Sequence, residues 1–221
     1  MAKQRTLLSL DYSGSGETVD DEGELTLQKL ASEVVGVTKA AGLNRFDIVG
    51  HSLGAAVVIE IAARHPDLIR SMVVVTGFAF GSEPRLQLQF ELWLDLLRMD
   101  RSAFLRLLLL SGLTPAFISR VGLSDIKDMI DGYMPVANWN GIRRQVELDL
   151  AVDVREQALR VRSPTLVVPS THDQIVTECA DLAARIPNAK LRRINAGHLA
   201  YFEGGDEFVS VLSEFLRQQE T

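Results

Sequence analysis

Short apolar runs alternate along the chain with longer segments in which apolar residues recur at helical spacing. The short runs are closed by turn residues and predict strands at 6–10, 46–49, 72–75, 165–168 and 190–194. The longer segments predict helices at 25–41, 53–64, 178–186 and 206–218, and Gly42 is the expected stop of the first. Strands that alternate with helices predict an α/β fold class, with a mostly parallel sheet and helices on both faces.

Residues 82–150 interrupt this alternation. The segment is helical in pattern, rich in Leu and punctuated by Pro and Gly. We expect it to be an inserted helical cap on a core formed by residues 1–81 and 151–221. Its aromatic and Leu residues either pack the cap itself or line a substrate cavity on its inner face.

Composition narrows the class of protein. A chain of 221 residues is expected to form one domain, and a net charge of -6 provides no basic stripe for nucleic acid or an anionic membrane. The single cysteine, Cys179, excludes an internal disulfide, and with four scattered histidines it predicts neither a metal site nor a bound cofactor. Without a secretory signal or a spanning segment, the expected location is the reducing cytoplasm.

The sequence Gly50-His51-Ser52-Leu53-Gly54 lies between a predicted strand and a predicted helix. This context is typical of a nucleophile elbow, in which a tight turn strains the serine backbone and needs small residues two positions away. Ser52 is therefore the candidate nucleophile. The backbone N–H of Leu53 is expected to face the developing oxyanion.

A serine hydroxyl needs a base to take its proton. His51 is inside the elbow, His65 lies at the far end of the following helix, and His172 is within the loop after a strand. His198 follows the last predicted strand and precedes the last helix, which places it at the same edge of the sheet as Ser52. His198 is the predicted base.

The third catalytic residue holds the histidine tautomer and stabilises its charged form. Asp173 directly follows the strand 165–168 and ends on the correct side of the sheet, so it is the predicted acid. A turn or a helix cap is the structural alternative for this residue. Asp153, Glu156 and Glu178 fit less well, because each lies in or beside a helical stretch.

From about residue 3 to residue 218, the chain resembles the α/β-hydrolase family. The motifs that carry the resemblance are Asp11-Tyr12-Ser13-Gly14-Ser15-Gly16-Glu17-Thr18, the elbow, Ala63-Arg64-His65-Pro66-Asp67, Ser163-Pro164-Thr165-Leu166-Val167-Val168 and Gly197-His198. The family usually opens with three strands and a His-Gly loop that donates the second oxyanion N–H, and this chain starts at the fourth, so the fold is N-terminally shortened. We expect 6–10 to pair with 46–49 or to leave a sheet edge unpaired.

Two explanations of this start stay open, a truncated family member, which we favour, and a natural variant whose gap is filled by rearrangement or by another subunit. Loss of one oxyanion donor costs about 100- to 1000-fold in turnover. The candidates to supply the missing hydrogen-bond donor to the oxyanion are Tyr12 and Ser13.

The resemblance implies a serine hydrolase that acts on an ester, thioester or lactone bond of a small, largely apolar substrate. Carbon–carbon cleavage and perhydrolysis use the same residues in the family. His51, Phe78, Trp93 and Trp139 are the expected substrate-pocket residues. A receptor-like binding protein, a low-activity member or an inert scaffold subunit is the alternative, and assembly into a homo-oligomer stays open.

Overall fold

A computed structural model of the chain describes residues 5–16, 18–19, 23–203 and 205–219. Its sheet contains β1 (Phe46–His51), β2 (Ile69–Val75), β3 (Thr165–Val168) and β4 (Ala189–Leu191), hydrogen-bonded in that order. All three pairings are parallel, with Val49 opposite Val73 and Val73 opposite Leu166. The prediction of a parallel sheet in an α/β fold is confirmed.

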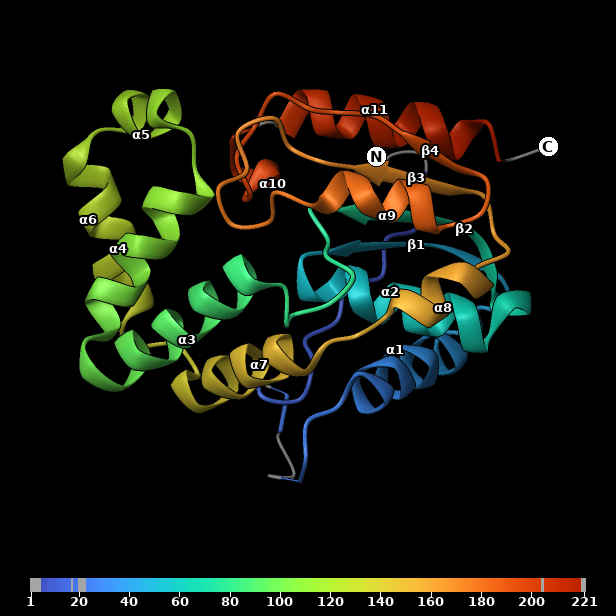
Figure 1. The fold of residues 1–221 in the computed structure, drawn as a ribbon, viewed down its shortest axis with the longest axis horizontal. Helices are drawn as coiled ribbons and strands as arrows, with labels where there is room; N and C mark the ends of the chain where they lie inside the picture. Colours follow the sequence, from blue (N-terminus) through green and yellow to red (C-terminus); the bar gives the residue numbers. More distant parts are fainter. Residues whose placement is uncertain (1–4, 17, 20–22, 204, 220–221) are drawn as a thin grey trace.

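Helices cover both faces of the sheet (Figure 1). One face carries α11 (Gly205–Arg217). The other carries α1 (Leu27–Ala40), α2 (Leu53–Arg64), α8 (Arg155–Arg160) and α9 (Cys179–Arg185). Two short helices, η1 (Pro66–Leu68) and α10 (Ala200–Glu203), lie in the connections between these elements. Helix α1 begins at Thr26, whose hydroxyl accepts the N–H of Lys29. It ends before Gly42, which has the expected left-handed φ of 73°.

Alternate residues of the strands belong to two separate apolar clusters. On β2, Met72 and Val74 pack with α1 and α2, whereas Val73 and Val75 pack with α11. This period of two is the strand geometry expected of a sheet buried on both faces. Because parallel strands all end at one edge, the loops after β1 and β3 meet there, and these loops carry Ser52 and Asp173.

The predicted strand at 6–10 is wrong. Residues 6–10 form no strand and pair with no part of β1. A groove of about 600 Å³ separates them from β1, and Leu8, Val49 and Leu212 are among the residues that line it. A strand exists only with a ladder partner, and the outer edge of β1 is unpaired within the described part of the chain.

Arg5 ties the segment before this groove to the sheet. Its guanidinium donates to Asp47 of β1 at 2.8 Å and to the carbonyl of Leu216 in α11 at 3.1 Å. Asp47 also accepts from Arg70 and from the hydroxyl of Ser71. Burial alone would raise the pKa of Asp47, but these hydrogen bonds and the two arginine charges outweigh it and hold the pKa below its ordinary value.

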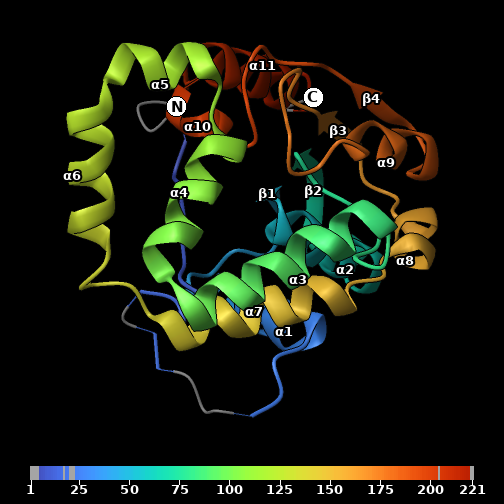
Figure 2. The same cartoon turned by 60° about the vertical axis from the view of Figure 1, so that its left-hand side comes forward.

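The region predicted as a cap contains α3 (Pro84–Met99), α4 (Arg101–Gly112), α5 (Pro115–Val121), α6 (Leu123–Tyr133) and α7 (Trp139–Ala151). Helices α3 and α7 lie side by side, and α4 to α6 extend from them (Figure 2). We keep the name cap for these helices. Within the described residues, no single helix is long and apolar enough to cross a membrane; α4 and α5 reach that composition only as a pair bent by 118°.

Candidate active site

The turn from β1 to α2 holds Ser52 in a strained backbone conformation. Ser52 has φ 54° and ψ -121°, in a region that non-glycine residues occupy at a cost of about 1–3 kcal/mol. A Cβ at Gly50 would overlap the carbonyl oxygen of Gly54, so the absence of a side chain at Gly50 allows the close approach of the two backbones at the elbow. A Cβ at Gly54 would only contact the Tyr12 hydroxyl at 3.5 Å. The strand-to-helix geometry that the sequence predicted is therefore present.

Ser52, His198 and Asp173 form one continuous hydrogen-bonded chain. His198 Nε2 lies 3.0 Å from Ser52 Oγ, and His198 Nδ1 lies 2.9 Å from Asp173 Oδ2. The imidazole is 3% exposed and the Asp173 side chain is also 3% exposed, so water does not compete for this contact. The structure thus brings together the three residues that the sequence singled out.

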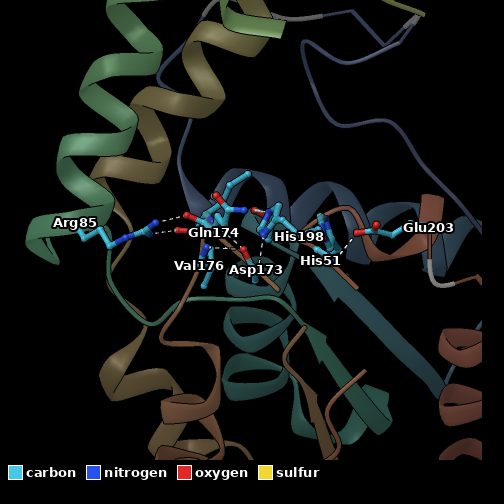
Figure 3. Close-up of polar contacts among 10 residues, drawn as sticks. His51, Arg85, Asp173, Gln174, Val176, His198 and Glu203 are labelled. Carbon is cyan, nitrogen blue, oxygen red and sulfur yellow. Dashed lines mark hydrogen bonds and ion pairs between the residues drawn. The ribbon is translucent and has the colours of Figure 1, made fainter. Parts of the chain in front are cut away.

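The loop that follows β3 orients the carboxylate of Asp173. Its Oδ1 accepts the N–H groups of Ile175 at 2.8 Å and Val176 at 2.9 Å, which leaves Oδ2 for His198. Arg85, at the start of α3, donates to the carbonyl of Ile175 at 2.9 Å and to the carbonyl of Gln174 (Figure 3). The cap therefore holds the acid loop directly.

His51 contacts His198, the predicted base, through its backbone. Its Nε2 lies 2.8 Å from the carbonyl oxygen of His198, to which it donates, and the two rings are 4.8 Å apart. Burial, together with the nearby His198, lowers the pKa of His51 to about 4. His51 is therefore neutral near pH 7, and its contact fixes the backbone of the base.

The N–H of Leu53, expected to face an oxyanion, lies in the first turn of α2. Leu53 is the first residue of that helix, so its N–H has no intrahelical acceptor. Of the two nearby donors expected from sequence, Ser13 is already engaged, because its N–H and hydroxyl both donate to Glu33. The Tyr12 hydroxyl lies beside Gly54, and burial and the charge of Glu33 raise its pKa to about 12, so it stays protonated.

The aromatic residues expected in the substrate pocket lie in two places. Phe78 and Trp93 belong to a row of buried rings from the core into the cap, with Phe90 between them and centroid separations of 5.6 Å on either side. Trp139 lies beside Tyr133, and its indole N–H donates to Met134. Contact of these residues with substrate stays a prediction.

Three of the alternatives to His198 and Asp173 have other partners. His65 caps the end of α2, His172 bonds the amide oxygen of Asn195, and Asp153 pairs with Arg155. No group of His, Cys, Asp and Glu suited to a metal ion occurs within the described ranges. Sequence reasoning missed Arg85 and Glu203, which lie on opposite sides of His198 and Asp173 (Figure 3). No local motif marks the long-range contacts of Arg85 with the loop of Asp173 or of Glu203 with Thr114.

The chain is similar to known proteins in sequence and in fold. The chain matches the family model described as alpha/beta hydrolase fold over residues 2–205. It is 42% identical over 217 residues to pyrrolizixenacetamide deacetylase of Xenorhabdus hominickii, an alignment that covers 97% of this chain and 82% of that protein.

Two solved structures share the fold. MGS-M2, an alpha/beta hydrolase enzyme from a Medee basin deep-sea metagenome library, aligns with a TM-score of 0.86 and 22% identity over 94% of this chain and 78% of its own. The enol-lactonase from Burkholderia xenovorans LB400 aligns with a TM-score of 0.82 and 23% identity over 94% of this chain and 79% of its own. The family match and the 42% identical relative together show that the chain is a hydrolase that belongs to the α/β-hydrolase fold family.

Proposed function

We propose that this hydrolase cleaves an ester-like or amide-like acyl bond of a small, largely apolar substrate by acyl transfer through Ser52. The observation that carries the proposal is the unbroken contact from Ser52 Oγ to His198 to Asp173. The name of the 42% identical relative, a deacetylase of an acetamide, supports a short acyl group on nitrogen or oxygen.

The first half of the reaction forms an acyl-enzyme. Ser52 Oγ attacks the substrate carbonyl carbon while its proton moves to His198 Nε2. The carbonyl oxygen becomes an oxyanion and accepts the N–H of Leu53. When the tetrahedral intermediate collapses, the bond to the leaving group breaks, and His198 returns the proton to the leaving oxygen or nitrogen.

The second half repeats these steps with water. His198 Nε2 takes a proton from a water molecule, whose oxygen attacks the acyl carbon, and the ester bond to Ser52 breaks as His198 protonates Oγ. Asp173 accepts the hydrogen bond from His198 throughout. It keeps the proton of His198 on Nδ1 and stabilises the imidazolium that forms in each half.

The decisive experiment is covalent labelling with a fluorophosphonate, followed by mass spectrometry of the labelled peptide. We expect the wild-type chain to be labelled once, on Ser52, and the Ser52→Ala variant to be neither labelled nor active. Labelling of Ser52→Ala at the wild-type rate, or a folded wild-type chain that resists the reagent, contradicts the proposal. In the second case, saturable binding of a substrate analogue without turnover would identify the receptor-like alternative.

The acyl preference is tested with p-nitrophenyl acetate, butyrate and octanoate and with p-nitroacetanilide as the amide. A short-acyl enzyme is expected to give its highest kcat/KM on acetate and measurable hydrolysis of the anilide. A kcat/KM that rises from acetate to octanoate contradicts the short acyl group while leaving the serine mechanism intact.

A further inference from the structure

The loop of the base, residues 197–199, is held by its peptide groups as well as by the ring of His198. The N–H of Leu199 donates to the carbonyl of Gly112 in the cap at 2.8 Å. The N–H of Gly197 donates to Oε1 of Glu203, the last residue of α10. The direction of the imidazole therefore depends on partners that are not themselves in the triad.

The second oxygen of Glu203 faces the cap. Its Oε2 accepts the hydroxyl of Thr114 at 2.6 Å and the N–H of Thr114 at 3.0 Å. Thr114 stands at the junction between α4 and α5, and its hydroxyl also accepts the N–H of Phe117 at 3.2 Å. One carboxylate thus joins the base loop to a cap junction 89 residues away in sequence.

The two segments also touch directly. A Cβ at Gly197 would overlap the carbonyl oxygen of Gly112 and the carboxylate of Glu203. A Cβ at Gly112 would lie 3.1 Å from the side chain of Leu199. With this close approach, the junction at 112–114 cannot shift without displacing the peptide groups on either side of His198.

We propose that Glu203 is a positioning residue for the catalytic base. It holds the loop of His198 at the distance that reaches both Ser52 and Asp173, and it does so only while residues 112–114 of the cap are docked on it. The proposal rests on the proposed function, because it states how the base of that same site is held. The alignment of His198 with Ser52 and Asp173 then requires that the cap is docked.

The chemistry of the contact explains why a carboxylate occupies this position. All three groups that face Glu203 are donors, and an ionised carboxylate offers only acceptors. A glutamine amide must turn its NH₂ toward one side, where it meets a backbone N–H, that of Gly197 or that of Thr114. Glu203→Gln therefore loses the hydrogen bond from one of these two N–H groups, with almost no change in volume.

The test compares Glu203→Gln with Glu207→Gln as a matched control. Glu207, on α11, accepts the N–H of Asn195 at 2.9 Å, so it also holds the segment before the base but does not reach Gly197 or the cap. In Glu203→Gln, kcat on p-nitrophenyl acetate is expected to fall about 10- to 100-fold, because small misplacements of a catalytic group cost this much. KM is expected to stay within about twofold of wild type, since the acyl pocket is untouched.

A spectroscopic measurement separates positioning from general destabilisation. The proton on His198 Nδ1 bonds to Asp173 and is expected as a downfield resonance in the proton NMR spectrum of the wild-type chain and of Glu207→Gln. In Glu203→Gln it is expected to shift or broaden at a temperature where circular dichroism shows a fully folded chain. A Glu203→Gln variant with the kcat and the resonance of Glu207→Gln overturns the proposal.

Thr114→Ala provides a second route if Glu203→Gln does not fold. It removes the hydrogen bond that the Thr114 hydroxyl donates to Glu203 and the one that it accepts from Phe117, and it keeps the carboxylate. A fall of kcat of about three- to tenfold at unchanged KM is expected. A wild-type kcat in folded Thr114→Ala overturns the coupling to the cap. Fluorophosphonate labelling of the wild-type chain shows in the same experiment whether the serine mechanism holds, so failure of the two proposals is distinguishable.

Discussion

Val49 of β1 and Val73 of β2 lie opposite each other in parallel register, yet Val49 is 44% exposed and Val73 is 0% exposed. Both point to the face of the sheet that α11 covers. Val73 packs in the apolar cluster with Leu212 and Phe215, whereas Val49 lines the groove between β1 and residues 6–10. Helix α11 packs on Val73, whereas Val49 lies on the outer strand β1, whose other edge is unpaired within the described residues.

This difference in burial predicts that replacement by alanine lowers the free energy of unfolding by different amounts at the two positions. Val73→Ala is expected to lower the free energy of unfolding by about 2 kcal/mol, because it removes buried methyl groups and leaves a cavity. Val49→Ala is expected to change it by about 0.5 kcal/mol or less, as for other exposed side chains. Urea unfolding of the two variants measures both values, and equal losses would show that the groove is closed in solution.

The close backbone approach at Gly50 predicts that adding a single methyl group there lowers both activity and stability. Gly50→Ala is expected to abolish most activity and to destabilise the chain, because its Cβ overlaps the carbonyl oxygen of Gly54 and forces the turn to move. Gly36→Ala, in the middle of α1 with nothing within 4 Å of the added Cβ, is the matched control. It is expected to stabilise the chain by up to about 1 kcal/mol, and thermal unfolding with an esterase assay tests both variants.

Asp173→Asn is expected to reduce kcat about 10⁴-fold while leaving the fold intact. The amide oxygen can still accept the N–H groups of Ile175 and Val176, which turns the NH₂ toward His198 Nδ1. The imidazole must then carry its proton on Nε2, the atom that has to accept the proton of Ser52. Asp153→Asn, which alters a surface ion pair, serves as the control and is expected to keep wild-type kcat.

The buried His51 predicts a dependence of stability on acid. Its folded pKa of about 4 lies below the ordinary 6.5, so between these values the unfolded chain binds a proton that the folded chain does not. The free energy of unfolding therefore falls as the pH falls from about 6.5 to about 4, by an amount on the order of 3 kcal/mol. Above about pH 6.5 this contribution is complete and constant.

His51→Gln isolates that contribution. The glutamine NH₂ replaces the donor to the His198 carbonyl but does not titrate, so the variant is expected to lose less stability than the wild type over the same pH interval. Urea unfolding at several pH values gives the two curves. Parallel curves would mean that His51 titrates in the folded chain near its ordinary pKa.

The sequence by itself determined the strand and helix alternation and the elbow, because both are local. Strand and helix periods depend on neighbours within one or two turns, and the motif around Ser52 is five residues long, with a close backbone approach that needs glycine at Gly50. The chain order of Ser52, Asp173 and His198 followed from the same reasoning, since loops after parallel strands meet at one edge of the sheet.

Only the tertiary structure decided the contacts made between distant segments. Residues 6–10 have the composition of a strand but form none, because a strand requires a partner that their own sequence does not specify. Arg85 reaches the loop of Asp173 across 89 residues, and Glu203 reaches Thr114 of the cap across 89 residues. No periodicity or motif encodes such contacts. The candidate catalytic residues could be predicted from local patterns, whereas the contacts that position them arise from packing, which depends on the whole chain at once.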